Sequence, residues 1–166
     1  MKFNYYAFKA IYLHEMDRFR RTLMQSLLSP VLSTSLYFIV FGSVIGGYVQ
    51  KIDGISYGSY IVPGLLMLTL LTQSISNTSF GIFFPKFNGT IYEILAAPIS
   101  TLEIVLAFVG AGATKTLIVG LMIFLTSTFF VEVEVKYPLL MIFLLVLVSF
   151  TFALFGFLIG LMSSNF

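Results

Sequence analysis

The first candidate for chemistry in this sequence is a lysine that stands in an otherwise apolar stretch. Lys115 follows two glycines in Gly110-Ala-Gly-Ala-Thr-Lys115-Thr116, which has the outline of a phosphate-binding loop. Such a loop requires a glycine immediately before the lysine and a strand before the loop. Thr114 occupies the glycine position, and the surrounding residues are apolar. The stretch therefore predicts a membrane helix whose glycines allow close packing or a bend, and not a nucleotide site.

Lys115 itself still needs an explanation, because an ammonium at mid-membrane costs roughly 2.5–3.5 kcal/mol on insertion scales. One interpretation is functional: the lysine faces a polar pathway or an anionic substrate. The other is structural: the side chain reaches the cytoplasmic leaflet, or the span begins later than Ile104. We favour the structural interpretation.

A second polar group precedes it along the chain. Thr69, Thr72, Gln73 and Ser76 fall within about 100° of one another on a helix, and together with Lys115 they form a candidate polar face. Hydroxyls and amides that converge in this way usually bond across helices, and lining a translocation path is the alternative. None of these side chains is a carboxylate, so an ion-coupled site of the usual acidic kind has no ligand here.

The sequence offers no catalytic or metal-binding constellation. It contains no cysteine, its one histidine is His14, and no Asp or Glu lies deep in an apolar stretch. We therefore expect no catalytic residues, no metal and no cofactor bound by this chain. The net charge of +2 is too small to indicate a nucleic-acid partner.

The elements that would carry these residues are transmembrane helices. Of the 166 residues, 58% are hydrophobic and 10% charged, whereas soluble domains carry roughly 25% charged residues. A span needs about 20 apolar residues, and the sequence predicts spans at about 25–49, 59–83, 104–131 and 138–162. Residues 1–166 are expected to form one all-α transmembrane domain, since every backbone polar group in lipid must be satisfied within its span.

The basic residues predict the orientation. One group precedes the first span or lies between the second and third, namely Lys2, Lys9, Arg18, Arg20, Arg21 and Lys86. The other two loops hold Lys51 and Lys136. The positive-inside rule then places both termini and the 85–101 segment in the cytoplasm.

Residues 2–21 predict an amphipathic helix that lies on the membrane surface. Its apolar face repeats at spacings of three and four: Tyr5, Phe8, Tyr12, Met16 and Phe19. Glu15 interrupts this face, and we expect it to pair with Arg18 at i,i+3. The helix would be either a simple topology anchor or a docking surface for a cytoplasmic partner.

Two pairs of glycines stand four residues apart within predicted spans. They are Gly42-x-x-x-Gly46 and Gly156-x-x-x-Gly160. This spacing lets two helix backbones approach closely, so each pair is a candidate helix-packing face.

The loop after the second span carries a family resemblance. Its sequence reads Phe84-Pro-Lys-Phe-Asn-Gly-Thr-Ile-Tyr-Glu-Ile-Leu-Ala-Ala-Pro-Ile-Ser100. This stretch resembles the first cytoplasmic loop of type-2 ABC exporter permeases, in which a Gly-Thr, a Glu-x-Leu and a Pro-Ile/Val-Ser pattern follow one another. Upstream, Tyr60-Ile-Val-Pro63-Gly64 is similar to the start of the family's second span, and the amphipathic helix before the first span also matches.

The resemblance implies a function as the membrane subunit of an ATP-driven exporter. The loop would be the coupling segment for a separate ABC ATPase, which uses the ATP and Mg, and its residues would be Gly89, Thr90, Tyr92, Glu93, Ile94, Leu95 and Pro98. Thr90 can cap a short helix there, and Pro98 can end it. The implied partners are a second copy or a close paralogue that completes the pathway, and the implied location is a bacterial-type inner membrane.

The chain departs from the family pattern in one respect. Members usually have six spans, whereas four are predicted here, so the chain is either a fragment of a longer reading frame or a truncated protein. We expect a continuation of the frame beyond Phe166 to encode two more spans. Two other classes stay open: a non-transporting assembly or anchor protein, and a small channel or secondary carrier. ATPase co-purification and ATP-driven efflux would separate the exporter from the anchor. Transport without ATP would favour the channel or carrier.

Overall fold

The computed structural model describes residues 3–45, 51, 52, 54–131 and 135–163. Its elements are α1 (Tyr5–Arg21), α2 (Leu23–Tyr37), the π-helix η1 (Phe38–Ile45), the strands β1 (Lys51–Ile52) and β2 (Ile55–Ser56), and the helices α3 (Tyr57–Phe87), α4 (Ile91–Ala96), α5 (Thr101–Phe130) and α6 (Pro138–Met162). The two short strands pair antiparallel. Within the described residues, this hairpin departs from the prediction of an all-α chain.

Four of these segments are long and apolar enough to cross a membrane. They are Leu23–Phe41, Tyr57–Phe87, Thr101–Phe130 and Pro138–Met162, which confirms the predicted number of membrane-length helices. The first was predicted to reach residue 49, but residues 46–50 lie outside the described part. At 1.5 Å per residue, the 31 residues of α3 and the 30 of α5 each extend about 45 Å, whereas the hydrocarbon core is about 30 Å thick. Both helices are therefore longer than the membrane alone requires.

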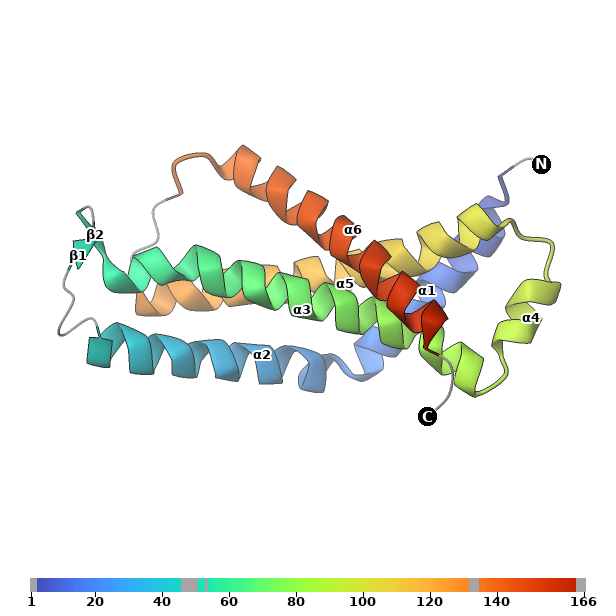
Figure 1. Ribbon diagram of the computed structural model, residues 1–166, viewed down its shortest axis with the longest axis horizontal. Coiled ribbons are helices and arrows are strands. Elements are labelled where there is room, and N and C mark those ends of the chain that lie inside the picture. Colours follow the sequence, from blue (N-terminus) through green and yellow to red (C-terminus); the bar gives the residue numbers. More distant parts are fainter. Residues whose placement is uncertain (1–2, 46–50, 53, 132–134, 164–166) are drawn as a thin grey trace.

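Helices α2, α3 and α5 run roughly along one long axis, which α6 crosses obliquely, and different loops lie at its two ends (Figure 1). The start of α1, the whole of α4 and the end of α6 lie toward one end, and the β1–β2 hairpin lies at the other. This arrangement is compatible with the prediction that both termini and the 85–101 segment share one side of the membrane. That this side is the cytoplasm stays a prediction.

Helix α5 lies at the centre of the bundle. Its buried residues run from Glu103 to Ser127, whereas of the described residues in α2 only Pro30 and Thr34 are buried. The buried face of α3 repeats mainly every four residues and consists of Gly58, Val62, Leu66, Leu70, Ser74, Thr78, Gly81 and Ile82. A core cluster of Ile82, Ile104, Phe108, Val109, Ala113, Ala153 and Phe157 joins α3, α5 and α6.

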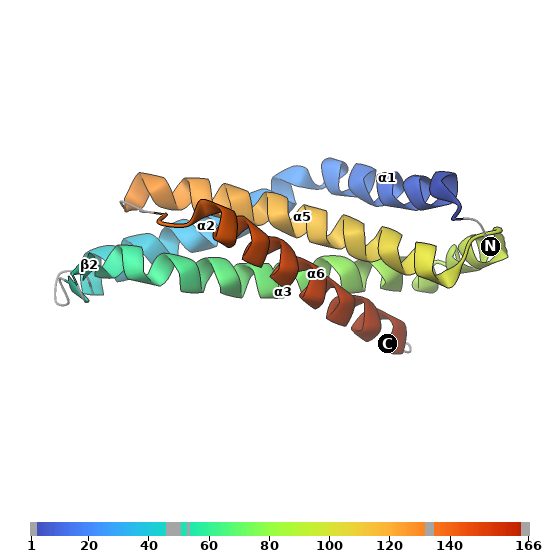
Figure 2. The ribbon, with the colours of Figure 1, turned by 90° about the horizontal axis from the view of Figure 1, so that it is seen from above.

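Helix α6 crosses α3 at very short range (Figure 2). A Cβ atom built on Gly156 would lie 2.5 Å from the carbonyl oxygen of Ile75, and one on Gly160 would lie 2.6 Å from that of Ser79. These two glycines therefore put the backbones of α6 and α3 in direct contact, as the packing hypothesis requires. Of the other candidate pair, Gly46 lies outside the described residues and Gly42 is described only as part of η1.

Helix α1 lies lengthwise against the first half of α5, and both helices run in the same direction (Figure 2). Asn4 contacts Glu103, Tyr12 contacts Thr114, and Glu15 contacts Lys115. One side of α1 is thus covered by protein, and the surface position predicted for this helix can apply only to the remaining sides. Tyr5, placed on the apolar face by its spacing, is 59% exposed.

Replacing Gly156 with alanine should destabilise the protein, because the new methyl group would overlap the Ile75 backbone, which cannot rotate away. We expect a loss of about 1–3 kcal/mol, read as a lower midpoint of thermal unfolding in detergent. Gly64→Ala is the matched control, since nothing lies within 4 Å of a Cβ at that position. Alanine there should be neutral or stabilise the helix by up to about 1 kcal/mol, and equal losses at both positions would contradict the packing argument.

Candidate functional site

A short helix between two long ones forms the first part of the candidate site. Helix α4 follows Gly89, whose φ of +78° lies in the left-handed region that glycine adopts without steric cost. Glu93 lies in the first turn of α4, where it complements the helix dipole. Thr90 occupies the N-cap position, but its side chain makes no capping hydrogen bond, so the predicted capping role is wrong. The tight turn at Gly89 starts this helix instead.

The far end of α4 is fixed by the beginning of α5. The Ser100 side chain accepts a hydrogen bond from the Glu103 backbone N–H, and a Glu103 carboxylate oxygen accepts from the Ser100 N–H at 2.8 Å. This reciprocal capping box holds the α4–α5 turn rigidly. Asn4 ties α1 to the same turn, because its backbone N–H donates to Glu103 and its side chain donates to the Pro98 carbonyl.

The side chains of α4 divide into two sets. Ile91 and Ile94 pack against the core cluster, whereas Tyr92 is 73% exposed and Leu95 is 63% exposed. Glu93 and Pro98 are exposed as well. Tyr92 and Leu95 border the cavity between α4 and the bundle, whereas Glu93 and Pro98 lie on the surface, and the two isoleucines hold the base of α4 in place.

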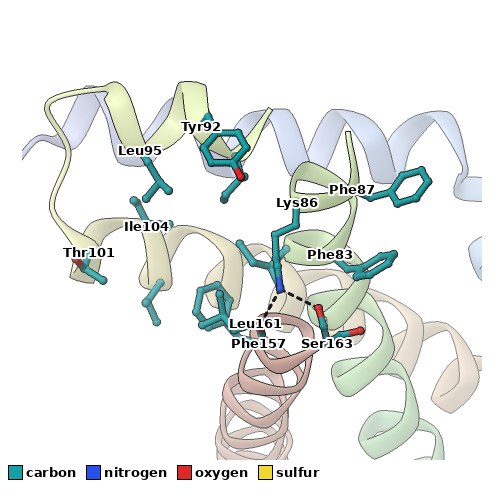
Figure 3. Close-up of a pocket in the computed structure, with 13 residues that line it drawn as sticks. Phe83, Lys86, Phe87, Tyr92, Leu95, Thr101, Ile104, Phe157, Leu161 and Ser163 are labelled. Atoms are coloured by element: carbon teal, nitrogen blue, oxygen red, sulfur yellow. Dashed lines mark hydrogen bonds between the residues drawn. The ribbon is translucent and has the colours of Figure 1, made fainter. Parts of the chain in front are cut away.

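A cavity of ≈ 610 Å³ lies beneath α4 (Figure 3). Its walls come from α3, α4, α5 and the end of α6, and Tyr92, Leu95, Ile104 and Phe157 are among the side chains that line it. Helix α4 is therefore held by the turns at its two ends and by Ile91 and Ile94, with the cavity beside them.

Lys86, in the last turn of α3, joins this region to α6 (Figure 3). Its ammonium donates to the carbonyl oxygens of Gly160, Leu161 and Ser163, at 3.3, 2.6 and 2.9 Å. The last carbonyls of a helix lack partners within the helix and carry the negative end of its dipole, so a cation there is stabilising. The sequence identified Lys86 only as a loop charge and gave no sign of this contact.

A buried ion pair lies on the other side of α5. The Lys115 ammonium is 2.7 Å from Glu15 Oε2, and Arg18 Nη2 is 2.8 Å from the same oxygen. Lys115 is 3% exposed and Glu15 2% exposed. The predicted Glu15–Arg18 pair is confirmed, whereas the Glu15–Lys115 pair was missed. One feature of the sequence could have indicated this pair. Glu15 lies on the apolar face of α1, and a carboxylate on a face that packs against protein needs a cation as its partner.

The glycines before Lys115 belong to the helix, as expected. Residues 110–116 lie within α5, and a Cβ on Gly112 would overlap the Thr78 side chain. Backbone N–H groups within a helix are bonded internally and are not free to hold a phosphate, so a nucleotide loop is excluded here. In the part of the chain that the structure describes, no three His, Cys, Asp or Glu side chains gather as metal ligands.

The candidate polar face of α3 turns partly outward. Thr72 and Ser76 are exposed, and Thr69 and Gln73 are half-buried. Thr69 and Thr72 donate to carbonyls of their own helix, and Gln73 accepts from Asn77 one turn later. Among the described hydrogen bonds, those of these residues stay within α3, so an interhelix role has no support among these bonds. Ser76 and Lys115, however, line the same small cavity.

Comparison with known proteins adds independent information. Residues 6–166 match the family model described as "ABC-2 type transporter". The chain is 38% identical over 160 residues to the inner membrane transport permease YadH of Escherichia coli K12, and equally to the YadH proteins of E. coli O157:H7 and Shigella flexneri. The match covers 96% of this chain and 62% of each relative, so the chain spans less than two thirds of their length. No solved structure matches it.

The ion triad leads to an asymmetric prediction. Glu15→Gln leaves the buried Lys115 without a counter-charge, and breaking a buried pair in this way costs about 3–5 kcal/mol. Lys115→Met should cost much less, because Glu15 keeps Arg18 and the methionine fills the space of the lysine stem. The measurement is the thermal midpoint of each variant in the same detergent. Equal losses, or a larger loss for Lys115→Met, would contradict the proposed sharing of one carboxylate.

Proposed function

The chain belongs to the ABC-2 type transporter family, and on that premise we propose that it forms the transmembrane subunit of an ATP-driven exporter whose ATPase is a separate protein. The observation that carries the proposal is the geometry of α4. This exposed short helix stands at the end of the two longest helices, at the position where the family's coupling segment is expected.

The exposed groups of α4 suit contact with a protein partner. Tyr92 and Leu95 are exposed at the border of the cavity beside α4, and aromatic residues are enriched at protein interfaces. Glu93 adds a negative charge for orientation. Since α4 is only six residues long, it would fit a narrow cleft in the ATPase better than a broad flat surface.

The connections of α4 explain how a movement of the ATPase would reach the membrane. The Gly89 turn joins α4 to α3, and the Ser100–Glu103 capping box joins it to α5. Both helices extend about 15 Å beyond a 30 Å hydrocarbon core. A displacement at α4 is therefore delivered to two rigid helices, and through Lys86 and Asn4 to α6 and α1 as well.

The complete transporter would need a second permease subunit, either identical or closely related, because this chain supplies only part of the pathway. The outward-facing polar side chains of α3 support such an arrangement, since a half-pathway exposes them until the partner is present. The same proposal places the protein in an inner membrane, with its N-terminus and α4 in the cytoplasm.

Coupling is tested by changing the exposed surface of α4. Glu93→Lys reverses a charge and Leu95→Asp places a charge where apolar contact is expected, so each should weaken co-purification of the co-expressed ATPase by at least about tenfold. ATP-dependent efflux should fall in parallel. Asp17→Lys, which makes the same charge change at an exposed position on α1, should leave both readouts unchanged.

Two outcomes would decide against the exporter. Unchanged ATPase binding and efflux in both α4 variants would favour an anchor or assembly role. Transport in vesicles without ATP would favour a channel or secondary carrier.

Orientation can be measured directly because the chain contains no cysteine. Single cysteines at Asn88, beside α4, and at Lys136, before α6, replace exposed residues. A membrane-impermeant maleimide should label Lys136→Cys in intact spheroplasts and Asn88→Cys only after permeabilisation. The reverse pattern would invert the proposed topology.

A further inference from the structure

A small cavity lies where α1 meets α2, and most of its lining is polar. Its volume is ≈ 100 Å³, and its polar lining consists of Arg18, Thr22, Ser26, Ser76, Asn77 and Lys115. Three of the lining residues, Thr22, Ser76 and Phe80, are exposed, so the cavity is open to the surface. It is distinct from the larger cavity beneath α4.

The cavity carries an excess of positive charge. Arg18 and Lys115 share the single carboxylate of Glu15, at 2.8 and 2.7 Å, which leaves a net charge of +1 on the triad. The Arg18 side chain is 35% exposed, and in the described structure its one ion pair involves a single guanidinium nitrogen. An arginine presents five N–H donors in a planar fork, so most of its donors remain available toward the cavity.

Two observations place the cavity at the level of a membrane–water interface, one from α2 and one from α3. Thr22 and Ser26 flank Leu23, where the first membrane-length segment begins. On α3, we take Tyr57, where the membrane-length segment begins, as the opposite boundary. Asn77 is the twenty-first residue from there, so about 30 Å of helix, one hydrocarbon thickness, separates the two. Lipid headgroups lie at this level.

We propose that this cavity binds the phosphate group of an anionic lipid, with Arg18 as the main contact and the hydroxyl and amide groups of Ser26, Ser76 and Asn77 as further donors. A phosphodiester offers the arginine fork two oxygens at once. The cavity holds a group of a few heavy atoms, so the acyl chains would lie outside along α2 and α3. Basic pockets between membrane helices on the cytoplasmic side bind acidic headgroups in this way.

The structure favours the lipid over a soluble anion because the cavity lies beside the long apolar surface of α2. Leu28, Leu32 and Leu36 of that helix are each more than half exposed. An acyl chain covers such a surface, whereas inorganic phosphate does not. A lipid headgroup and inorganic phosphate both offer a phosphate oxyanion, and the experiment below distinguishes the two.

The test is thermal unfolding of the full chain in a neutral detergent, with phosphatidylglycerol titrated against phosphatidylcholine. We expect phosphatidylglycerol to raise the unfolding midpoint of the wild-type protein and phosphatidylcholine to do so far less. Arg18→Gln should weaken the apparent phosphatidylglycerol affinity about fivefold, as expected for one basic side chain near a headgroup. Lys9→Gln, which removes the same charge from an exposed position on α1, is the matched control and should change the affinity by less than about twofold.

Glu15→Gln gives a readout that a purely structural triad would not. Removing the carboxylate frees the Arg18 guanidinium from its ion pair, so the phosphatidylglycerol affinity should increase although the variant unfolds at a lower temperature without lipid. An affinity that stays the same or falls in Glu15→Gln would show that the cations serve only the ion pair, and would overturn the proposal.

The remaining arms distinguish the ligand sources. Stabilisation by phosphatidylglycerol that persists in Arg18→Gln would overturn the site. A third outcome would show that the site binds free phosphate and not a lipid. In that case inorganic phosphate stabilises the wild-type protein but not Arg18→Gln, and phosphatidylglycerol stabilises neither. None of these measurements requires the ATPase, so their outcome is independent of the proposed export function.

Discussion

A charge inside an apolar chain needs a partner, and the place of α1 follows from that requirement. Lys115 is buried in α5, the central helix, and a buried ammonium without a counter-charge is strongly unfavourable. Glu15 supplies the counter-charge from α1. Tyr12 and Asn4 add polar contacts to α5 farther along the same side of the helix. Thr22 is the residue at which α1 ends and α2 starts, so the docking of α1 in this register also positions the beginning of the first span.

Close helix packing and polar contacts at the helix ends then hold the remaining helices together. The glycines of α6 bring its backbone onto α3, and Lys86 holds the last carbonyls of α6 from the end of α3. The capping box of α5 and the side chain of Asn4 hold the α4–α5 turn. Because these contacts involve backbone atoms, they leave little room for sliding, and the end of the bundle that carries α4 is expected to move as a body.

What the sequence could predict was mainly local. Apolar length gave the four long helices, and the i,i+3 spacing gave the Glu15–Arg18 pair. The pattern of the 85–101 loop located a short helix ahead of Pro98, which the structure shows as α4. Each of these depends on residues close together in the chain, where composition and periodicity carry direct information.

What the sequence could not predict depends on tertiary contact. Lys115 was expected to reach the leaflet or to lie nearer the end of its span, yet it is buried against a residue that precedes it by 100 positions. The contacts of Lys86 with α6 span more than 70 positions. Thr90 shows the opposite failure: a favourable residue stands at the N-cap position, but its side chain makes no capping bond. Its backbone is helical, with φ of −63° and ψ of −16°, whereas a capping residue normally has an extended backbone.

The separation of Glu15 and Lys115 along the chain has a consequence for biogenesis. A ribosome adds about 5–20 residues per second, so roughly 5–20 s pass between the synthesis of the carboxylate and that of its buried partner. During this interval Glu15 has Arg18 nearby but lacks Lys115, and the α5 surface that covers it does not yet exist. The final position of α1 is therefore reached late, after the third span has entered the bilayer, and the first span must be inserted before its N-terminal neighbour has docked.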